Sequence, residues 1–462
     1  MREIWIFKIS AASRNFSNSI ARHVRDYGKF SIVSTTIAAR VSHPTGLYVL
    51  FFTEMWERYS FYSMMAILSL YMNEALHFDI AHVGRVYGLY TAGVYFLPLA
   101  GGLLADRLLG FNRAIIIGGV LMMLGHLVLG VELMPFFYSG LVLLACGSGL
   151  LKPNVSTIVG NLYRSRPELR DQGFNIFYVG INLGAFVSPL TVSWLRAHYG
   201  WSVAFMSAAV AMLFSLVTFI GFNRYVAEAA TKVPKTSTEA RTIRPAEARS
   251  RVITLLAVFA ISTAFWLAFY QIFYTFTFWA RDNTATTVAP ERFQVFEPLG
   301  VIVLSPALVA IWMWLQRRDA EPSTPVKMLL GVLLCAGAFG TLAYAGSIGG
   351  DTGRVSPLWL IAANIIIALG EIALSPMGLS LVNSIAPPRS RGLLMGGWFV
   401  SLAVGGYLSG YIGAYWDRMP HSRFFAMVAA ILVGTAVPLS MMAPQIKRTI
   451  RRAEAEERVA AQ

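Results

Sequence analysis

The residues of this sequence that are best placed to do chemistry are charged side chains inside long apolar segments. Glu54, Glu57 and Arg58 occur together in the stretch Phe52-Thr-Glu-Met-Trp-Glu-Arg-Tyr. Positions i, i+3 and i+4 share one face of a helix, so the two carboxylates neighbour one another and Arg58 can pair with Glu54. Two acids that share one cation leave one carboxylate undercompensated, and in a desolvated site that carboxylate readily takes up a proton. We therefore predict a reversible proton carrier on this helix.

Three further polar residues occur in other apolar segments. Lys152 lies in Gly147-Ser-Gly-Leu-Leu-Lys-Pro-Asn, Glu371 lies in Leu369-Gly-Glu-Ile-Ala-Leu-Ser-Pro, and Asn182 lies in a segment between these two. A charge at the centre of a bilayer costs at least about 2.5–3.5 kcal/mol, so each charged residue is a candidate for function. The alternative is a buried ion network that only holds helices together. The spread over several segments favours a central aqueous cavity.

The composition of the chain requires a membrane around these residues. Of its 462 residues, 56% are hydrophobic and only 13% are charged, whereas a soluble protein has about 45–50% apolar and about 25% charged residues. A membrane helix needs about 20 apolar residues. The apolar runs predict twelve spans, at 46–72, 84–105, 114–131, 135–160, 172–195, 201–222, 252–279, 297–316, 327–346, 357–384, 392–416 and 424–443.

The basic residues divide unequally between the two sides of such a membrane protein. Of the 38 Lys and Arg residues, 29 fall on one side and 7 on the other, and the remaining two, Arg58 and Lys152, lie inside spans. Since cytoplasmic loops carry the excess of basic residues, both termini are expected in the cytoplasm. The net charge of +14 is then explained by topology and by contact with anionic lipid, and it does not indicate a nucleic-acid partner.

The basic linker at 223–251 separates six predicted spans from six. We expect an N-terminal six-helix bundle at 43–222 and a C-terminal six-helix bundle at 252–443. Residues 1–42 are expected to form a disordered basic extension, and residues 444–462 a cytoplasmic tail.

A glycine-rich segment follows the second predicted span on its basic side. It reads Gly101-Gly-Leu-Leu-Ala-Asp-Arg-Leu-Leu-Gly-Phe-Asn-Arg. Small residues allow close helix approach, and an acid with two arginines can bridge neighbouring helix ends. The segment resembles the conformational-lock motif of the major facilitator superfamily, which would consist here of Gly102, Asp106, Arg107, Gly110 and Arg113.

The chain also resembles a branch of that superfamily, the proton-dependent oligopeptide transporters, over about residues 43 to 443. The resemblance rests on the E-x-x-E-R core at 54–58 and on four later motifs in the right order: Leu151-Lys-Pro-Asn-Val-Ser-Thr, Phe177-Tyr-Val-Gly-Ile-Asn-Leu-Gly-Ala, Glu321-Pro-Ser-Thr-Pro-Val-Lys and Gly370-Glu-Ile-Ala-Leu-Ser-Pro-Met-Gly-Leu-Ser. It implies an all-α membrane protein of the major facilitator fold, with about twelve transmembrane helices in two six-helix bundles. It also implies a multi-pass location in the plasma membrane, the inner membrane if the source is bacterial.

The activity implied by the resemblance is symport of di- and tripeptides with protons by alternating access. Arg58 and Lys152 would hold the substrate carboxylate, and Glu371 with Asn182 would meet its amino group. The remaining roles would be proton coupling by Glu54 and Glu57, lining of the site by Tyr62 and Tyr95, and side-chain pockets formed by Trp266 and Trp398. Protons are the expected coupling ion, with no metal or other cofactor, and we expect a monomer to suffice.

The sequence departs from the family pattern at three places. Relatives usually carry an acid just after the tryptophan of the seventh span, where this chain has Phe269 and Tyr270. The basic residue that commonly pairs with that acid is replaced by Met65, so neither partner is left as an orphan charge. Glu297 stands where relatives usually place an asparagine. Glu297 is expected either to take a protonation role or to add a second anion for the substrate amine, unless it is only a water-exposed residue at a helix N-terminus.

Two other functions remain open at this stage. The changes at 269–270 and 297 fit a carrier of a non-peptide or of a modified amino acid, with Tyr270 and Glu297 as the residues expected to bind it, and a sensor that keeps the fold is a further alternative. An enzyme is not expected, because the sequence has no nucleophile elbow, phosphate-binding glycine loop or Cys/His metal set.

Overall fold

The computed structural model describes residues 43–231, 245–387 and 390–461, which are almost entirely helical. The predicted extension at 1–42 and part of the predicted linker, 232–244, lie outside the described residues. Within those residues the only extended pairing is an isolated bridge between Thr284 and Val355. The predicted all-α class is confirmed.

The first half of the described chain forms five helices. They are α2 (Thr45–Leu70), α3 (Ile80–Leu104), α4 (Phe111–Leu129), α5 (Met134–Leu162) and α6 (Arg170–Gly221). Short π-helical turns at Tyr71–Ala75 and Ala105–Leu109 extend α2 and α3. Helix α6 contains two spans that meet at Gly200, whose φ of +84° is a left-handed conformation that favours glycine.

The second half forms seven helices. They are α7 (Pro245–Phe269), α8 (Thr275–Asp282), α9 (Phe296–Gln316), α10 (Thr324–Ile348), α11 (Leu358–Ile385), α12 (Arg391–Gly413) and α13 (His421–Ala461). A 3₁₀ turn at Tyr270–Phe273 separates α7 from α8, so these two helices make a single interrupted span.

Two helices extend beyond the predicted spans. Helix α7 is described from Pro245, within the predicted linker segment, and α13 continues into the predicted tail. Arg251 explains both extensions, since it pairs with Glu247 one turn earlier at 2.6 Å and with Glu456 of α13 at 2.9 Å. These ion pairs tie the first turns of α7 to the last turns of α13.

The described helices account for twelve spans. Ten helical segments are long and apolar enough to cross a membrane, and one of them, Pro167–Gly221, contains the two spans of α6. Helix α2 is not among these ten. It carries Glu54, Glu57 and Arg58, and these three charged residues lower its mean hydropathy.

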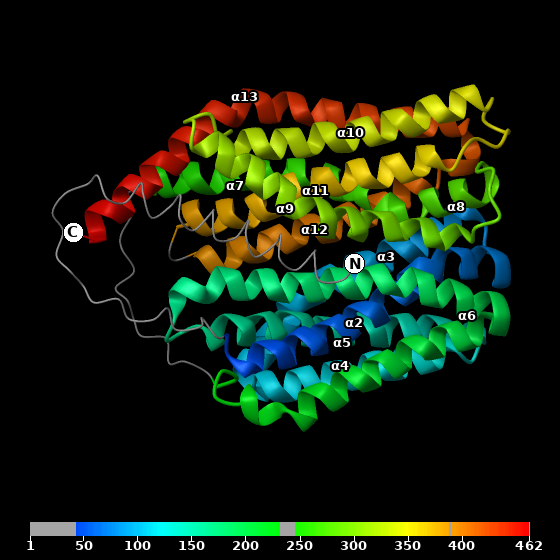
Figure 1. The fold of residues 1–462 in the computed structure, drawn as a ribbon, viewed down its shortest axis with the longest axis horizontal. Helices are drawn as coiled ribbons and strands as arrows, with labels where there is room; N and C mark the ends of the chain where they lie inside the picture. The colour runs from blue at the N-terminus through cyan, green and yellow to red at the C-terminus, as the bar shows by residue number, and fades with distance from the viewer. Residues whose placement is uncertain (1–42, 232–244, 388–389, 462) are drawn as a thin grey trace, which may run out of the picture. The chain divides into compact units, whose positions relative to one another are not determined.

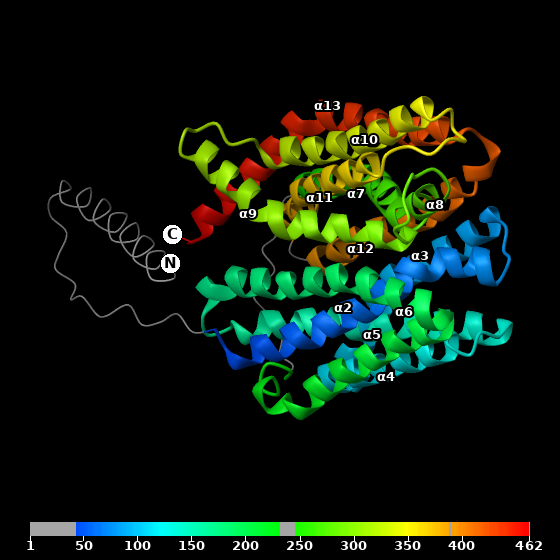
Figure 2. The ribbon, with the colours of Figure 1, turned by 45° about the vertical axis from the view of Figure 1, so that its right-hand side comes forward.

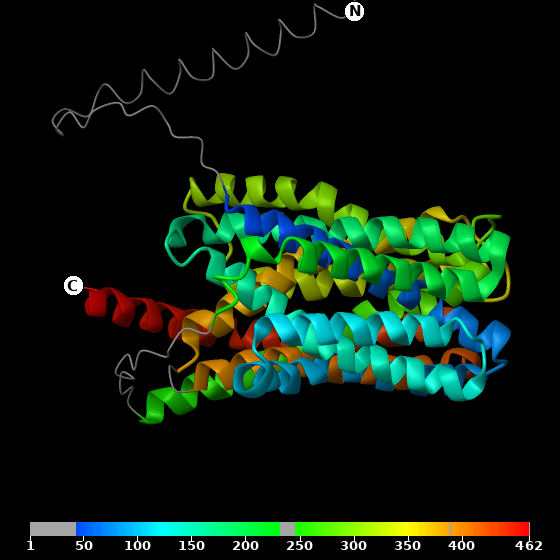
Figure 3. The ribbon, with the colours of Figure 1, turned by 90° about the horizontal axis from the view of Figure 1, so that it is seen from below.

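The helices gather into two groups that follow the chain order. Figures 1 and 2 both place α2, α4, α5 and α6 on one side, and α7, α9, α10, α11 and α13 on the other. Figure 3 gives a third view of the same helices. Helices α3 and α12 pack closely against one another at the division. Their backbones can approach because Gly88 has no side chain, and a Cβ there would lie 2.8 Å from the carbonyl oxygen of Tyr407.

Candidate functional site

The charged triad on α2 is buried and shares one cation. The Nε atom of Arg58 donates to Glu54 Oε1 at 2.9 Å and lies 2.6 Å from Glu57 Oε2. The exposed fractions are 4% for Glu54, 0% for Glu57 and 5% for Arg58. Neither oxygen of Glu57 has a hydrogen-bond partner in the part of the chain that the structure describes. The predicted pairing of Arg58 with Glu54 is confirmed, and each of the two carboxylates keeps at least one oxygen without a hydrogen-bond partner among the described residues.

Helix α6 holds this turn of α2 in place. Gly184 lies so close to α2 that a Cβ there would be 2.8 Å from the backbone nitrogen of Tyr59 and 3.0 Å from the Cβ of Arg58. Two turns further along α6, the hydroxyl groups of Tyr59 and Thr191 lie 2.6 Å apart. A larger side chain at this glycine would push α6 away from the triad.

Lys152 on α5 supplies a second buried cation. Its Nζ lies 4.6 Å from the ring centroids of both Phe61 and Tyr95, in cation–π geometry. The same atom is buried without a hydrogen-bond acceptor among the described residues. Sequence reasoning missed Phe61, although its place three residues after Arg58 puts it on the charged face of α2. An ammonium that has rings but no acceptor around it can still bind an anion.

Two carboxyl groups meet in the second half of the chain. Glu297 lies in the first turn of α9 and Glu371 lies on α11, and their side chains are close enough to interact electrostatically. Glu297 is 7% exposed, so it is not the water-exposed helix-terminal residue of the alternative interpretation. No ion pair involves either carboxyl group in the described residues.

Tyrosines lie between the cations of the first half and these carboxyl groups. Tyr62 on α2 is within electrostatic range of Arg58 and also of Glu297 and Glu371. Tyr178 on α6 is likewise within electrostatic range of Glu371 and Glu297. Sequence reasoning missed Tyr178, which stands inside the Phe177-Tyr-Val-Gly motif. These tyrosines connect the two halves of the site.

Asn182 has a more limited position than predicted. It is 7% exposed, and its Nδ2 donates to the backbone carbonyl of Tyr178 at 3.0 Å. Its amide nitrogen is therefore occupied by its own helix. The contact of Asn182 with a substrate amine stays a prediction.

The aromatic residues of the second half are deeply packed. The exposed fractions of Trp266, Tyr270 and Trp398 are 5%, 2% and 2%. Trp398 packs against Gly378 of α11, where a Cβ would collide with its ring. The Tyr270 ring lies 5.6 Å from the Tyr95 ring, measured between centroids. Trp398 and Trp266 fill space between helices here, and their predicted role in side-chain pockets stays a prediction.

Phe269 and Met65, two positions where the sequence departs from the family pattern it resembles, are packed in apolar surroundings. Phe269 lies against Trp266 and Tyr270, with ring centroids 5.3 and 5.7 Å apart. Met65 is 1% exposed. Phe269 is therefore part of a packed aromatic cluster, and Met65 is buried as an apolar side chain.

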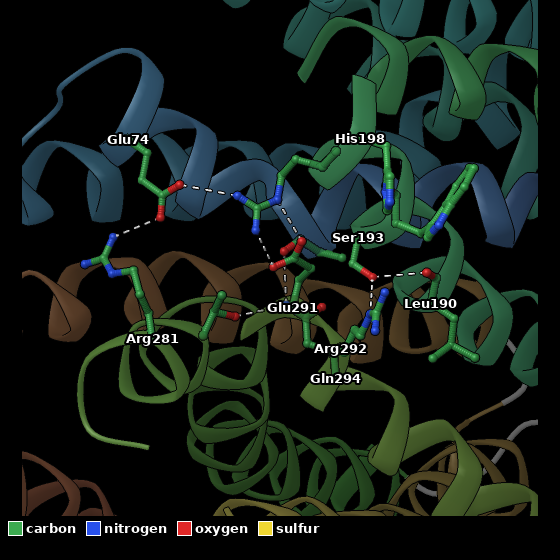
Figure 4. A network of polar contacts seen from close by, with 12 residues as sticks. Glu74, Leu190, Ser193, His198, Arg281, Glu291, Arg292 and Gln294 are labelled. Carbon is green, nitrogen blue, oxygen red and sulfur yellow. Dashed lines mark hydrogen bonds and ion pairs between the residues drawn. The ribbon is translucent and has the colours of Figure 1, made fainter. Parts of the chain in front are cut away.

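An ion network joins the two halves at one end of the spans (Figure 4). Arg196, near the end of the first span of α6, binds Glu291 through two hydrogen bonds of 2.8 and 3.1 Å. Arg196 also pairs with Glu74 at 3.4 Å, and Glu74 pairs with Arg281 at 3.3 Å. The Glu291 side chain is 0% exposed. We call these four residues the end network.

Further hydrogen bonds join the halves beside the end network. Arg292 Nε donates to Ser193 Oγ at 2.7 Å, and Gln294 Nε2 donates to the carbonyl oxygen of Ala66 at 3.2 Å (Figure 4). The hydroxyl group of Tyr274 donates to the carbonyl oxygen of Ile80 at 2.5 Å. Sequence reasoning treated the arginines of this end only as loop charges. Two acids, Glu74 and Glu291, occur in predicted loops on the same side as these arginines and could have indicated ion pairs.

The segment that resembles the conformational lock lies at the opposite end of α3. Gly110, with φ +75°, forms the turn between the π-helical residues and α4. Asp106, Arg107 and Arg113 are exposed there. The close helix contact is made by Gly101 and not by Gly102, because a Cβ on Gly101 would collide with the backbone of α5, whereas one on Gly102 would make ordinary contact. The locking role of these residues stays a prediction.

Comparison with known proteins decides the family. Residues 112–232 and 223–429 match the model described as the POT family. The chain belongs to the POT family.

Several relatives of the POT family are similar over most of their length. The peptide transporter YePEPT of Yersinia enterocolitica is 31% identical, with 90% of this chain and 97% of the relative covered. A di-/tripeptide transporter of Lactococcus lactis is 30% identical, covering 85% of this chain and 94% of its own. The solved structure of a peptide transporter POT in complex with sulfate has a TM-score of 0.82 at 30% identity, covering 89% of this chain and 96% of that one.

These relatives are transporters and not enzymes. The similarity of this fold to their solved structures confirms the major facilitator architecture that the sequence predicts. The described residues contain no group of three or more His, Cys, Asp and Glu side chains that could hold a metal ion.

Proposed function

We propose that this protein imports di- and tripeptides together with protons by alternating access. The end network would face the outside of the cell and both termini the cytoplasm, in agreement with the distribution of basic residues. The protein would work in the plasma membrane as a monomer, because the chain by itself supplies both ends of the site. The names of its relatives, which include di- and tripeptide transporters, support this substrate class.

The observation that carries the proposal is a separation of unpaired charge across the two halves. The first half presents Lys152, whose ammonium has no hydrogen-bond acceptor in the described structure, beside Arg58. The second half presents Glu297 and Glu371, which have no cation paired with them in the ion pairs of the described residues. A peptide zwitterion fits this arrangement, with its carboxylate at the cations and its ammonium at the carboxyl groups.

The triad on α2 would couple proton movement to the binding of this carboxylate. Arg58 is held by two carboxylates, Glu54 and Glu57, when both are ionised. A proton on Glu57 removes one of these negative charges. The Arg58 guanidinium is then less strongly bound within the triad and binds the substrate carboxylate more strongly. Proton binding and peptide binding would then favour one another. When the halves open to the cytoplasm, loss of the proton from Glu57 returns Arg58 to the triad and weakens peptide binding.

Uptake of labelled dialanine into proteoliposomes tests the proposal. We expect accumulation with an inward proton gradient and only equilibration without one. Glu57→Gln should strongly lower the accumulation, while Glu168→Gln, a matched change at an exposed carboxylate, should leave it intact. If folded wild-type protein accumulates no dialanine in the gradient, peptide symport is excluded.

A second candidate function is favoured by Glu297. A second carboxyl group at the amine end fits a small amino compound as well as a peptide, and a solved POT structure with 5-aminolevulinic acid bound has a TM-score of 0.81 at 25% identity to this chain. A carrier of such compounds would show gradient-driven uptake of a labelled amino acid derivative that dialanine does not inhibit. A protein that kept the fold only as a sensor would bind ligand without any uptake.

A further inference from the structure

The approach of Glu297 to Glu371 is built into the packing of two helices. Gly300 lies one turn after Glu297, and Ala368 lies one turn before Glu371. A Cβ on Gly300 would stand 2.7 Å from the Cβ of Ala368. The absence of that Cβ allows α9 to approach α11 and brings the two carboxyl groups together.

Among the residues that the structure describes, no cation forms an ion pair with Glu297 or Glu371. The titratable groups that face it are tyrosines, namely Tyr178 of α6, Tyr62 of α2 and Tyr95 of α3. In the turn before α9, Glu291 is bound by Arg196 and Arg292 is bound to Ser193. Glu297 Oε1 is buried and has no hydrogen-bond partner among the described residues.

Two adjacent carboxyl groups in such a place cannot both stay ionised without strong repulsion. A hydrogen bond between them requires a proton on one of the two oxygens. Paired carboxyl groups that share one proton carry a net charge of −1. This charge equals and opposes that of a single substrate ammonium.

We propose that the carboxyl pair of Glu297 and Glu371 binds the substrate ammonium while it holds one shared proton, so that one proton crosses the membrane at this pair with each peptide. The proton stays in the O–H···O⁻ bond between the carboxyl groups, and the ammonium donates to the remaining oxygens. When the site opens to the cytoplasm, water solvates both carboxylates, and the ammonium and the proton leave. The pair would thus add a second coupled proton to the one carried on α2. This inference rests on the proposed symport.

The proton-to-peptide ratio is the measurement that tests the pair. The proteoliposomes are held at zero membrane potential and contain more dialanine inside than outside. The inward pH gradient at which net dialanine flux stops then gives the proton-to-peptide ratio. We expect the ratio to fall by one proton in Glu297→Gln relative to wild type, because a single carboxylate matches the ammonium without a proton. The number of protons taken up on dialanine binding, measured from the slope of log Kd against pH, should also fall by one.

Two further variants test whether the change in the ratio depends on the carboxyl group of Glu297. Glu297→Asp keeps a carboxyl group and should keep the wild-type ratio. Glu297→Asn, with the residue that relatives usually carry, replaces Glu297→Gln if the latter does not fold, and it should show the lower ratio. An unchanged ratio in the folded Gln or Asn variant overturns the inference. Failure of the proposed symport itself would give a different result. The wild-type protein would then accumulate no dialanine, and no proton-to-peptide ratio could be measured.

Discussion

The end network should set the balance between the two conformations of the transporter, and Glu291→Gln tests this. The network joins α6 of the first half to the segment before α9 in the second half. Because these contacts join residues of both halves, we expect them to break when the halves separate at this end. Glutamine keeps the size of the side chain and removes the negative charge that holds Arg196. The variant should therefore favour the conformation that is open at this end.

The size of the free-energy change in Glu291→Gln follows from the burial of Arg196 and from the partners that Arg196 keeps. Removing one partner of a buried ion pair costs about 3–5 kcal/mol. Here the cost is lower, because the Arg196 side chain is 18% exposed and keeps Glu74 at 3.4 Å and the ring of Trp201 at 4.8 Å. We take about 2 kcal/mol, which changes the ratio of open to closed protein about 30-fold.

Spin-label distance measurements can detect such a change. Met134 and Thr287 are exposed residues of the two halves. Labels at Met134→Cys and Thr287→Cys would report their separation after both native cysteines, Cys146 and Cys335, are replaced. We expect Glu291→Gln to shift the distribution from a shorter to a longer population.

A matched control separates this effect from a general loss of charge. Glu132 is an exposed carboxylate in the loop between α4 and α5. Glu132→Gln removes the same charge without touching the end network and should leave the distances unchanged. If Glu291→Gln gives the wild-type distance distribution in a folded protein, the end network does not hold this end closed.

Three other changes should each have a defined effect. Phe61→Leu removes one of the two rings on Lys152 and should weaken dialanine binding by about 0.5–1 kcal/mol, a two- to fivefold rise in Kd, without unfolding the protein. Gly101→Val should lower the thermal unfolding midpoint in detergent, because its side chain collides with the backbone of α5 at Gly149, whereas Gly102→Ala should lower it little. Gly200→Ala places a Cβ at φ +84° and should cost about 1–2 kcal/mol of stability, measured by the same thermal unfolding; an unchanged midpoint would contradict the left-handed turn.

Local spacing was enough to predict the triad on α2. Glu54, Glu57 and Arg58 fall on one helical face whatever surrounds the helix, so their mutual contact follows from the 3.6-residue period. Composition and the length of the apolar runs likewise indicated a membrane protein of twelve spans, because each span must be satisfied within the bilayer by its own backbone hydrogen bonds. The order of several motifs then pointed to the family that the comparisons show.

Contacts between distant segments were decided only by the tertiary structure. The meeting of Glu297 with Glu371, the rings around Lys152 and the end network depend on how far each helix is rotated and how closely it approaches its neighbour. Glycines at 300 and 101 control that approach through the absence of a Cβ, and a one-dimensional pattern does not say which glycine touches which helix. The sequence by itself thus determined the membrane class, the spans and the charges within each span. Packing between helices decided which of those charges are paired and which are left free to bind.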